Sequence, residues 1–244
     1  MNYKRILIKL SGESLMGDVA LIDKNKTKEI ADLIKKVREM GVQVGIVIGG
    51  GNFFRGRSNQ DMYQLYVDTM GMLGTTINAL GLADAFRNED VPCIISTPFD
   101  LNGLIPKYQD DEVLDKIKDN VVIFGGGTGH IGCSTDTCAS NKASLIKADT
   151  IIKLTNVDGV YDKDPNKYQD AKMYDKLSHS EVLANPEIKV MDIPAIEECM
   201  KNDIDINVIN FNDKENLIKV LNSEKIGTRI SNHAKWEWKK NTWI

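Results

Sequence analysis

The stretch VVIFGGGTGHIGCSTDT, residues 121–137, joins an apolar run to a glycine-rich segment and then to polar residues typical of a helix start. Gly127, Gly129 and Gly132 have the spacing of a dinucleotide-binding turn, G-x-G-x-x-G. From Gly127 the sequence also matches the phosphate-loop motif G-x-x-x-x-G-K-[ST], except that Cys133 stands where that motif has its lysine. Both patterns predict a strand, an anion-binding loop and a helix in this order, and they leave open which phosphate the loop holds.

The alternation of strand and helix continues on both sides of this stretch. Apolar runs predict strands at 5–10, 42–49, 93–98, 120–125, 150–155 and 206–210. Helices are predicted at 27–40, 62–86, 112–117, 135–147, 178–183 and 193–201, and a last helix is opened by Asn212 with Glu215 three residues on. Near-continuous apolar strands between helices are typical of a parallel sheet buried on both faces, so the sequence predicts an α/β fold.

Composition narrows the class of protein. The 244 residues are 42% hydrophobic, enough to bury the core of one α/β domain. A net charge of -4 offers no broad basic surface, which argues against a nucleic acid partner and favours a small-molecule ligand. Lys9 interrupts the first apolar run too early for a secretory signal, and no apolar run is long enough to span a membrane, so we expect a cytoplasmic protein with no membrane partner. The cysteines are expected to stay reduced, and His130, Cys133 and Cys138 are too irregularly spaced to predict a metal site.

Glycine and polar residues follow four of the predicted strands. The segments are SGE after the first strand, GGGNFFRG after the second, GGGTGHIG after the fourth and NVDGVYDKDP after the fifth. Parallel strands end at the same edge of a sheet, so these segments should lie close together. Two glycine-rich loops, with Lys9 and Arg55, indicate two phosphate-bearing ligands that face each other, as transfer of a phosphoryl group between nucleotides requires. Lys9 also interrupts an apolar strand, where a buried charge without a function is costly.

These motifs carry a family resemblance. KLSGE (9–13), VIGGGNFFRG (47–56), DTMGML (68–73), GTG with STD (127–136), VDGVYDKDP (157–165) and KVMD (189–192) stand in the order found in bacterial UMP kinases (uridylate kinases) of the amino acid kinase superfamily. The resemblance covers residues 4 to about 230. It implies a three-layer α/β/α sandwich formed by one domain, residues 1–231, that transfers the γ-phosphoryl group of ATP to UMP in pyrimidine nucleotide biosynthesis. It also implies a homohexamer regulated by GTP and UTP, with Mg2+ held mainly by the ATP phosphates and no metal ligands on the protein.

The resemblance also assigns roles to individual residues. Lys9, Arg55, Asp136 and Asp192 match catalytic positions, although from the residues alone Asp136 and Asp192 fit helix N-terminal carboxylates better. The expected ATP-binding residues are Lys9, Leu10, Ser11, Gly12, Gly51, Arg55, Thr155, Asn156, Tyr161 and Asp164. The expected UMP-binding residues are Gly50, Asp68, Thr128, Gly129, His130, Ile131, Gly132, Cys133, Ser134 and Thr135.

Some features depart from the family pattern and leave alternatives open. Residues 130–134 lack the aromatic pair usual in the family, and Lys142 stands where an arginine is usual. One alternative is another superfamily enzyme that phosphorylates a carboxylate or carbamate. A second is a dinucleotide-binding oxidoreductase or redox sensor built on Gly127, Gly129 and Gly132, with Asp158 as the acid for the ribose. The Trp-rich tail, residues 232–244, has three open interpretations: a segment that docks on a neighbouring subunit, a segment that binds another partner, or an added remnant that is not part of the native protein.

Overall fold

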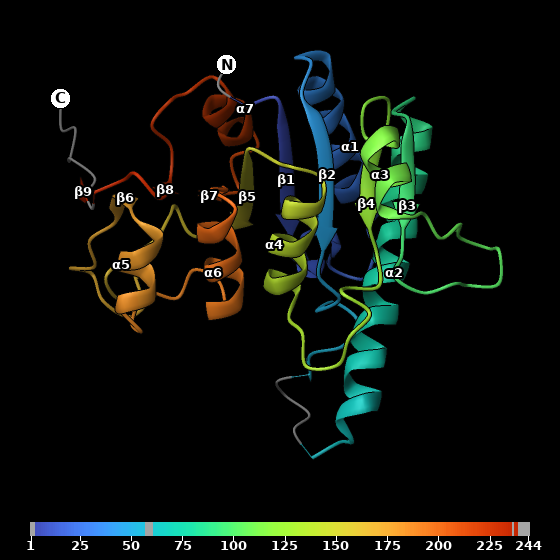
Figure 1. Cartoon of the computed structure of the whole chain (residues 1–244), viewed down its shortest axis with the longest axis horizontal. Helices are drawn as coiled ribbons and strands as arrows, with labels where there is room; N and C mark the ends of the chain where they lie inside the picture. The colour runs from blue at the N-terminus through green and yellow to red at the C-terminus, as the bar shows by residue number, and fades with distance from the viewer. Residues whose placement is uncertain (1–2, 57–60, 236, 239–244) are drawn as a thin grey trace.

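The computed structural model describes residues 3–56, 61–235 and 237–238 (Figure 1). In this part of the chain one mixed sheet has the strand order β3-β4-β2-β1-β5-β7-β8-β6-β9. The strands are β1 (Arg5–Leu10), β2 (Gln43–Ile48), β3 (Cys93–Ser96), β4 (Val121–Phe124), β5 (Thr150–Thr155), β6 (Tyr174–Leu177), β7 (Asp205–Asn210), β8 (Thr228–Ile230) and β9 (Glu237–Trp238). The helices are the 3-10 turn η1 (Gly12–Leu15) and α1 (Lys24–Glu39), α2 (Gln64–Asn88), α3 (Asp110–Lys116), α4 (Thr135–Leu145), α5 (His179–Ala184), α6 (Ile193–Lys201) and α7 (Glu215–Leu221).

Helices cover both faces of the sheet. Alternate residues of β1 point to opposite sides, so Ile6 and Ile8 pack in a core with α1, α2 and α7, whereas Leu7 packs in a second core with α3, α4, α5 and α6. Figure 1 shows α4 and α6 in front of the sheet and α1 and α2 behind it. The predicted α/β sandwich with three layers is confirmed.

The carboxyl ends of the central strands meet at one edge, as predicted. β1 pairs in parallel with β2 and β5, and β2 pairs in parallel with β4. Their following loops therefore converge at the lower edge of the sheet in Figure 1, where the N-terminal end of α2 extends beyond the strands. This arrangement brings the two glycine-rich loops and the first turn of α4 to one place.

The C-terminal third differs most from the sequence prediction. The short strands β6, β8 and β9 have no clear period in the sequence and were not predicted. The last helix begins at Glu215 and not at Asn212, because the Asp213 carboxylate accepts from the Glu215 N–H at 3.0 Å while the Asn212 N–H donates to the Asn210 side chain. Elsewhere the predicted boundaries shift by a few residues, and Gly41, with a φ of 80°, ends α1 as expected.

Part of the Trp-rich tail joins the sheet. β9 pairs antiparallel with β6, and the Trp238 ring stacks on Tyr174 with 4.3 Å between the ring centroids. Trp236 and Trp243 lie outside the described residues, so docking of the tail on a neighbouring subunit stays a prediction. None of the helices in the described ranges has the length and apolar character that crossing a lipid bilayer demands.

Candidate active site

Two lysines from neighbouring strands flank one carboxylate at the carboxyl edge of the sheet. Lys9 of β1 and Lys153 of β5 are partners in the parallel register. Each lies two residues after a member of the second core, Leu7 or Ile151, so both side chains are on the face of the sheet that α4 covers. Asp136 in the first turn of α4 lies between them, with its Oδ1 at 3.1 Å from Lys9 Nζ and its Oδ2 at 3.2 Å from Lys153 Nζ. We call these three residues the lysine–aspartate cluster.

The lysine–aspartate cluster is largely shielded from water. The side chains of Lys9 and Lys153 are each 16% exposed and that of Asp136 is 20% exposed. Burial alone would raise the pKa of the Asp136 carboxyl, but the ammonium groups of Lys153 and Lys9 outweigh burial and hold the pKa below its usual value. Burial lowers the pKa of Lys153, and the charge of Lys9 adds to this effect while Asp136 opposes it.

Asp192 connects the N-termini of two helices. It is the N-cap of α6, with Oδ1 accepting from the Ala195 N–H at 3.2 Å. Its Oδ2 accepts from the Ser134 hydroxyl and, at 2.8 Å, from the Thr137 hydroxyl. Ser134 in turn caps α4 by accepting from the N–H groups of Asp136 and Thr137. The N-cap role that Asp192 suggests from sequence is therefore present, and through Ser134 it fixes the turn that carries Asp136.

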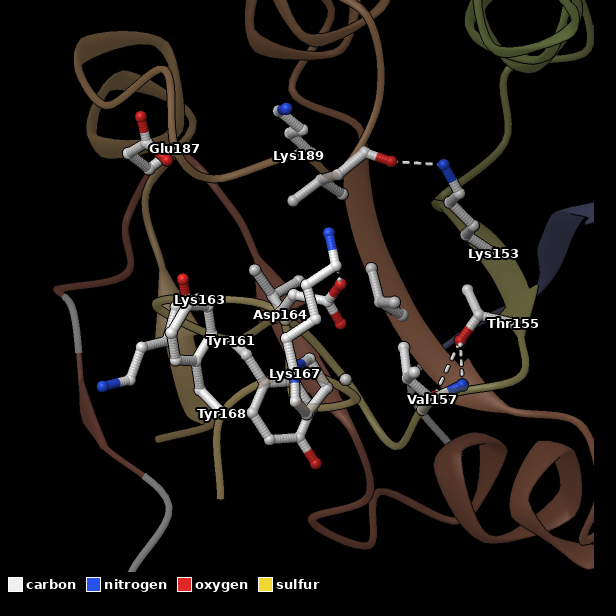
Figure 2. A pocket seen from close by; sticks show the side chains of 15 residues that line it. Lys153, Thr155, Val157, Tyr161, Lys163, Asp164, Lys167, Tyr168, Glu187 and Lys189 are labelled. Atoms are coloured by element: carbon white, nitrogen blue, oxygen red, sulfur yellow. Dashed lines mark hydrogen bonds and ion pairs between the residues drawn. The ribbon is translucent and has the colours of Figure 1, made fainter. Parts of the chain in front are cut away.

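A first cavity, of about 760 Å³, opens beside the end of β5 (Figure 2). Figure 2 shows the amine of Lys153 directed at the Val190 carbonyl, to which it donates, with Thr155 and Tyr161 from the predicted ATP site also in view. The Thr155 hydroxyl donates to the Val157 carbonyl at 2.7 Å, which holds the start of the loop. The lining includes Lys153, Thr155, Val157, Tyr161, Lys163, Asp164, Lys167, Tyr168, Glu187, Lys189 and Val190.

A second cavity, of about 580 Å³, is lined by Lys9 and Asp136 of the lysine–aspartate cluster. Arg55 and Glu13 form an ion pair at 2.8 Å on its wall. Asp68 of α2 accepts from the Gly132 N–H at 2.6 Å and so connects α2 to the loop after β4. Among the predicted site residues, the lining includes Lys9, Gly50, Gly51, Arg55, Asp68, Thr128, His130, Gly132, Cys133, Ser134, Thr135 and Asp136.

Six predicted binding residues line neither cavity: Leu10, Ser11, Gly12, Asn156, Gly129 and Ile131. Leu10 is buried in the first core, and the Ser11 hydroxyl is 3.0 Å from that of Ser14. Gly12 instead allows close packing, because a Cβ at this position would lie 2.3 Å from Asn52 Oδ1. Sequence reasoning missed Lys153, although TIIKLT contains the same lysine within an apolar strand that drew attention to Lys9.

A buried amide pair holds the glycine loop after β2. Asn78 of α2 is fully buried and donates to the Gly49 carbonyl at 2.7 Å. The side chains of Asn78 and Asn52 also donate to each other at 2.8 and 2.9 Å. A Cβ on Gly50 would lie 2.9 Å from the Gly71 carbonyl oxygen, so close packing of α2 on this loop requires glycine.

The loop after β4 uses its glycines for backbone conformation. Gly127, Gly129 and Gly132 have φ values of 62°, 78° and 78°, which L residues rarely adopt. Asp158, the proposed ribose acid of the dinucleotide alternative, accepts from the Asn210 side chain at 2.8 Å. Cys138 is buried, which raises the pKa of its thiol to about 11 and leaves little thiolate to support a redox role with Cys133. The buried Cys138 thiol therefore does not favour the redox alternative, whereas positive φ values at the three glycines would suit a dinucleotide-binding loop as well.

Family comparison agrees with this site. The model of the amino acid kinase family matches residues 4–210, which include both cavities and the whole lysine–aspartate cluster. The chain therefore belongs to the amino acid kinase family.

Solved structures place the chain more narrowly. The UMP kinase of Bacillus anthracis is 31% identical, with a TM-score of 0.92 and coverage of 98% of this chain and 99% of that chain. The UMP kinase of Ureaplasma parvum is 34% identical, with a TM-score of 0.87 and coverage of 95% and 100%. The uridylate kinase of Archaeoglobus fulgidus is 29% identical, with a TM-score of 0.69 and coverage of 92% and 99%. Within the family, the chain thus groups with the UMP kinases.

Proposed function

We propose that this protein transfers the γ-phosphoryl group of ATP to UMP, giving ADP and UDP. One observation carries the proposal: the lysine–aspartate cluster connects two cavities, since Lys153 lines the first and Lys9 and Asp136 line the second. A nucleotide in each cavity would present its phosphates to the same positive groups. The related UMP kinases supply the identity of the donor and acceptor.

The protein's contribution is positioning and charge neutralisation, which phosphoryl transfer chiefly requires. The ATP base and ribose occupy the first cavity beside Thr155, Tyr161 and Asp164. UMP occupies the second cavity, with its phosphate near the amide of Gly50. Gly51 and Arg55, which the family resemblance assigns to ATP, line this same cavity, so we place them beside the UMP phosphate instead. Lys9 contacts the moving phosphoryl group, and Asp136 fixes Lys9 rather than acting as a base.

Asp68 and the loop after β4 hold the acceptor nucleoside. Asp68 accepts from the ribose hydroxyls, and residues 128–135 surround the base and phosphate. The hydrogen bond from the Gly132 N–H to Asp68 keeps the loop beside this carboxylate. Ser134, held by Asp192, directs the first turn of α4 toward the transferred group, so Asp192 acts here by positioning.

In this proposal Mg2+ binds together with ATP, held mainly by the ATP phosphates. Within the described ranges there is no group of three or more His, Cys, Asp or Glu side chains arranged to hold a metal ion. Both oxygens of Asp136 are already bonded to lysines. Mg2+ in kinase sites is usually bound by substrate phosphates and water together with one or two carboxylates, so such a site needs no cage of protein ligands.

We also propose a homohexamer in the cytoplasm, active in pyrimidine nucleotide biosynthesis and regulated by GTP and UTP. α2 supports self-association, because Tyr66, Leu73, Ile77 and Leu80 are exposed and recur at helical spacing on one face. Light scattering of the purified protein tests the assembly, and titration of GTP and UTP in the kinase assay tests the regulation.

An ADP-release assay with ATP and Mg2+ tests the activity. The acceptors are UMP, CMP, dTMP, acetylglutamate, glutamate, aspartate and carbamate, which cover the carboxylate and carbamate branch of the family. We expect a strong preference for UMP. Turnover with a carboxylate or carbamate but not with UMP would refute the proposal, as would NADH binding at micromolar concentration without turnover of any acceptor.

A further inference from the structure

Asn78 is a polar side chain on the buried face of α2. It is fully buried, and the Asn52 side chain that it contacts is 8% exposed. Each amide donates one N–H to the oxygen of the other, at 2.8 and 2.9 Å. The second N–H of Asn78 donates to the Gly49 carbonyl at 2.7 Å, and Asn52 donates to the Leu21 carbonyl at 2.8 Å. The two amides therefore satisfy each other and also bind the backbone, as buried polar groups require.

The Gly49 carbonyl needs an anchor because glycine lies on both sides of its peptide bond. A peptide between two glycines rotates with little steric resistance, and such a rotation exchanges the directions of its C=O and N–H groups. The peptide bonds of the described residues are trans, so the Gly50 N–H points away from the Gly49 carbonyl. While Asn78 holds this carbonyl, the Gly50 N–H is directed to the opposite side of the peptide.

The peptide that follows is also anchored through its carbonyl. The Gly50 carbonyl accepts from the N–H groups of Phe53 and Phe54, each at 3.0 Å. Gly50 and Gly51 themselves line the second cavity. Successive backbone N–H groups on one side of a turn form a concave site for an anion. If the first peptide rotated, it would present a carbonyl oxygen to the anion, and the two negative groups would repel each other.

We propose that Asn78 is a positioning residue that directs the Gly50 N–H at the phosphate of the acceptor nucleotide. The inference rests on the proposed function, which puts this phosphate beside Gly50, and adds to it a residue that lines neither cavity. Asn52 binds the other N–H and the oxygen of Asn78, so the Asn78 amide keeps an N–H toward Gly49. Asn78 thus acts on UMP through the peptide and not by contact.

Asn78→Ala tests the inference, with Asn207→Ala as the matched control. Asn207 is a second buried asparagine, 4% exposed, and it lines neither cavity of the site. Its amide donates to the side chains of Tyr3 and Thr150 at 3.2 and 2.9 Å. The dissociation constants of UMP and of uridine, which lacks the phosphate, are measured by calorimetry, with uridine in competition with UMP. The ratio of the two constants reports what the phosphate contributes to binding.

The expected change is confined to the phosphate. Loss of a hydrogen bond to a charged group weakens binding by about 10- to 100-fold, so we expect this loss for UMP in Asn78→Ala. Uridine binding should stay within about threefold of the wild type, because the base and ribose do not contact this peptide. α2 also carries Asp68, the proposed ribose ligand, so a general displacement of the helix would weaken both ligands alike.

Three results would overturn the inference. They are unchanged UMP binding in Asn78→Ala, equal weakening of UMP and uridine, and a control whose ratio falls as far as that of Asn78→Ala. Asn78→Ser, judged by the same ratio, replaces Asn78→Ala if the latter does not fold. Its hydroxyl offers Asn52 a polar partner but is one bond shorter than the amide nitrogen that binds Gly49.

Failure of this inference is distinguishable from failure of the proposed function. If the wild type binds UMP but does not phosphorylate it, the proposed function fails. If the wild type phosphorylates UMP and the ratio in the variant stays within about threefold of the wild type, only the role of Asn78 fails.

Discussion

Asp136→Asn should destabilise the fold as well as slow transfer. The substitution keeps the shape of the side chain but removes the negative charge that lies 3.1 Å from Lys9 and 3.2 Å from Lys153. Unit charges about 4 Å apart attract by about 4 kcal/mol at an effective dielectric constant near 20. Removing one partner of a buried ion pair costs about 3–5 kcal/mol. Because the cluster is partly exposed, we expect the free energy of unfolding to fall by about 2–4 kcal/mol.

Thermal and urea unfolding at pH 7 measure this change. For a chain of this size, a loss of about 2–4 kcal/mol lowers Tm by roughly 4–16 °C. The control is Asp115→Asn, which removes an exposed ion pair with Lys118 at 2.7 Å and should leave Tm unchanged. If Asp136→Asn melts within about 2 °C of the wild type, the lysine–aspartate cluster is not held together by charge and the estimate from its geometry is wrong.

The same variant has a defined pH dependence. The folded pKa of Asp136 lies below its ordinary value of 3.8, so the folded state binds its proton less readily than the unfolded state does. Its stabilising contribution is therefore fully present above that value and is lost as the pH falls through the folded pKa. The difference in stability between the wild type and Asp136→Asn should shrink in this acid range and stay constant between pH 6 and 8.

Four further changes test other parts of the site and fold. Lys9→Ala should lower kcat by about 10²-fold or more in steady-state assays, and a change confined to the KM for ATP would contradict its role. Gly12→Ala should cost about 1–3 kcal/mol in urea unfolding, because the added Cβ would lie 2.3 Å from Asn52 Oδ1. Burial lowers the pKa of His179 in the folded state below 6.5, so on acidification the unfolded state binds a proton at this side chain before the folded state does. The free energy of unfolding should therefore decrease as the pH drops below about 6.5, and this decrease should be smaller in His179→Gln. The loop after β4 lacks bulky aromatic rings, so we expect kcat/KM for UMP to exceed that for dUMP or CMP by about 10- to 200-fold. Cys133→Phe should change this preference. A preference above roughly 10⁴ in the wild type would contradict a loosely packed acceptor pocket.

The sequence predicts best those features that the residue pattern of a single strand or loop shows by itself. Apolar runs such as RILIKL predict buried strands, and parallel strands must end at a common edge, so the meeting of the glycine loops with Lys9 could be expected. β6 and β8 were missed because each has only three or four residues and depends on pairing with distant strands. Their formation is a tertiary effect.

The sequence also does not predict residue roles that depend on the pairing register of two strands or on the packing of two helices. Lys9 and Lys153 stand side by side only because β1 and β5 pair in one particular register. The contact of Asp192 with Ser134 depends likewise on how α6 packs against α4. The family resemblance indicated that Asp136 and Asp192 lie near the site, but not which partners they bind. Neither strand alone indicates that its lysine shares a carboxylate with the other.

Direct transfer between the two cavities is most simply tested by following the phosphoryl group itself. The purified protein is incubated with Mg2+, UMP and ATP labelled with ³²P in its γ-phosphate, and the products are separated and counted. The account predicts that one UDP forms for each ADP and that the label is recovered in the β-phosphate of UDP. Release of the label as inorganic phosphate at the same rate with and without UMP would contradict it.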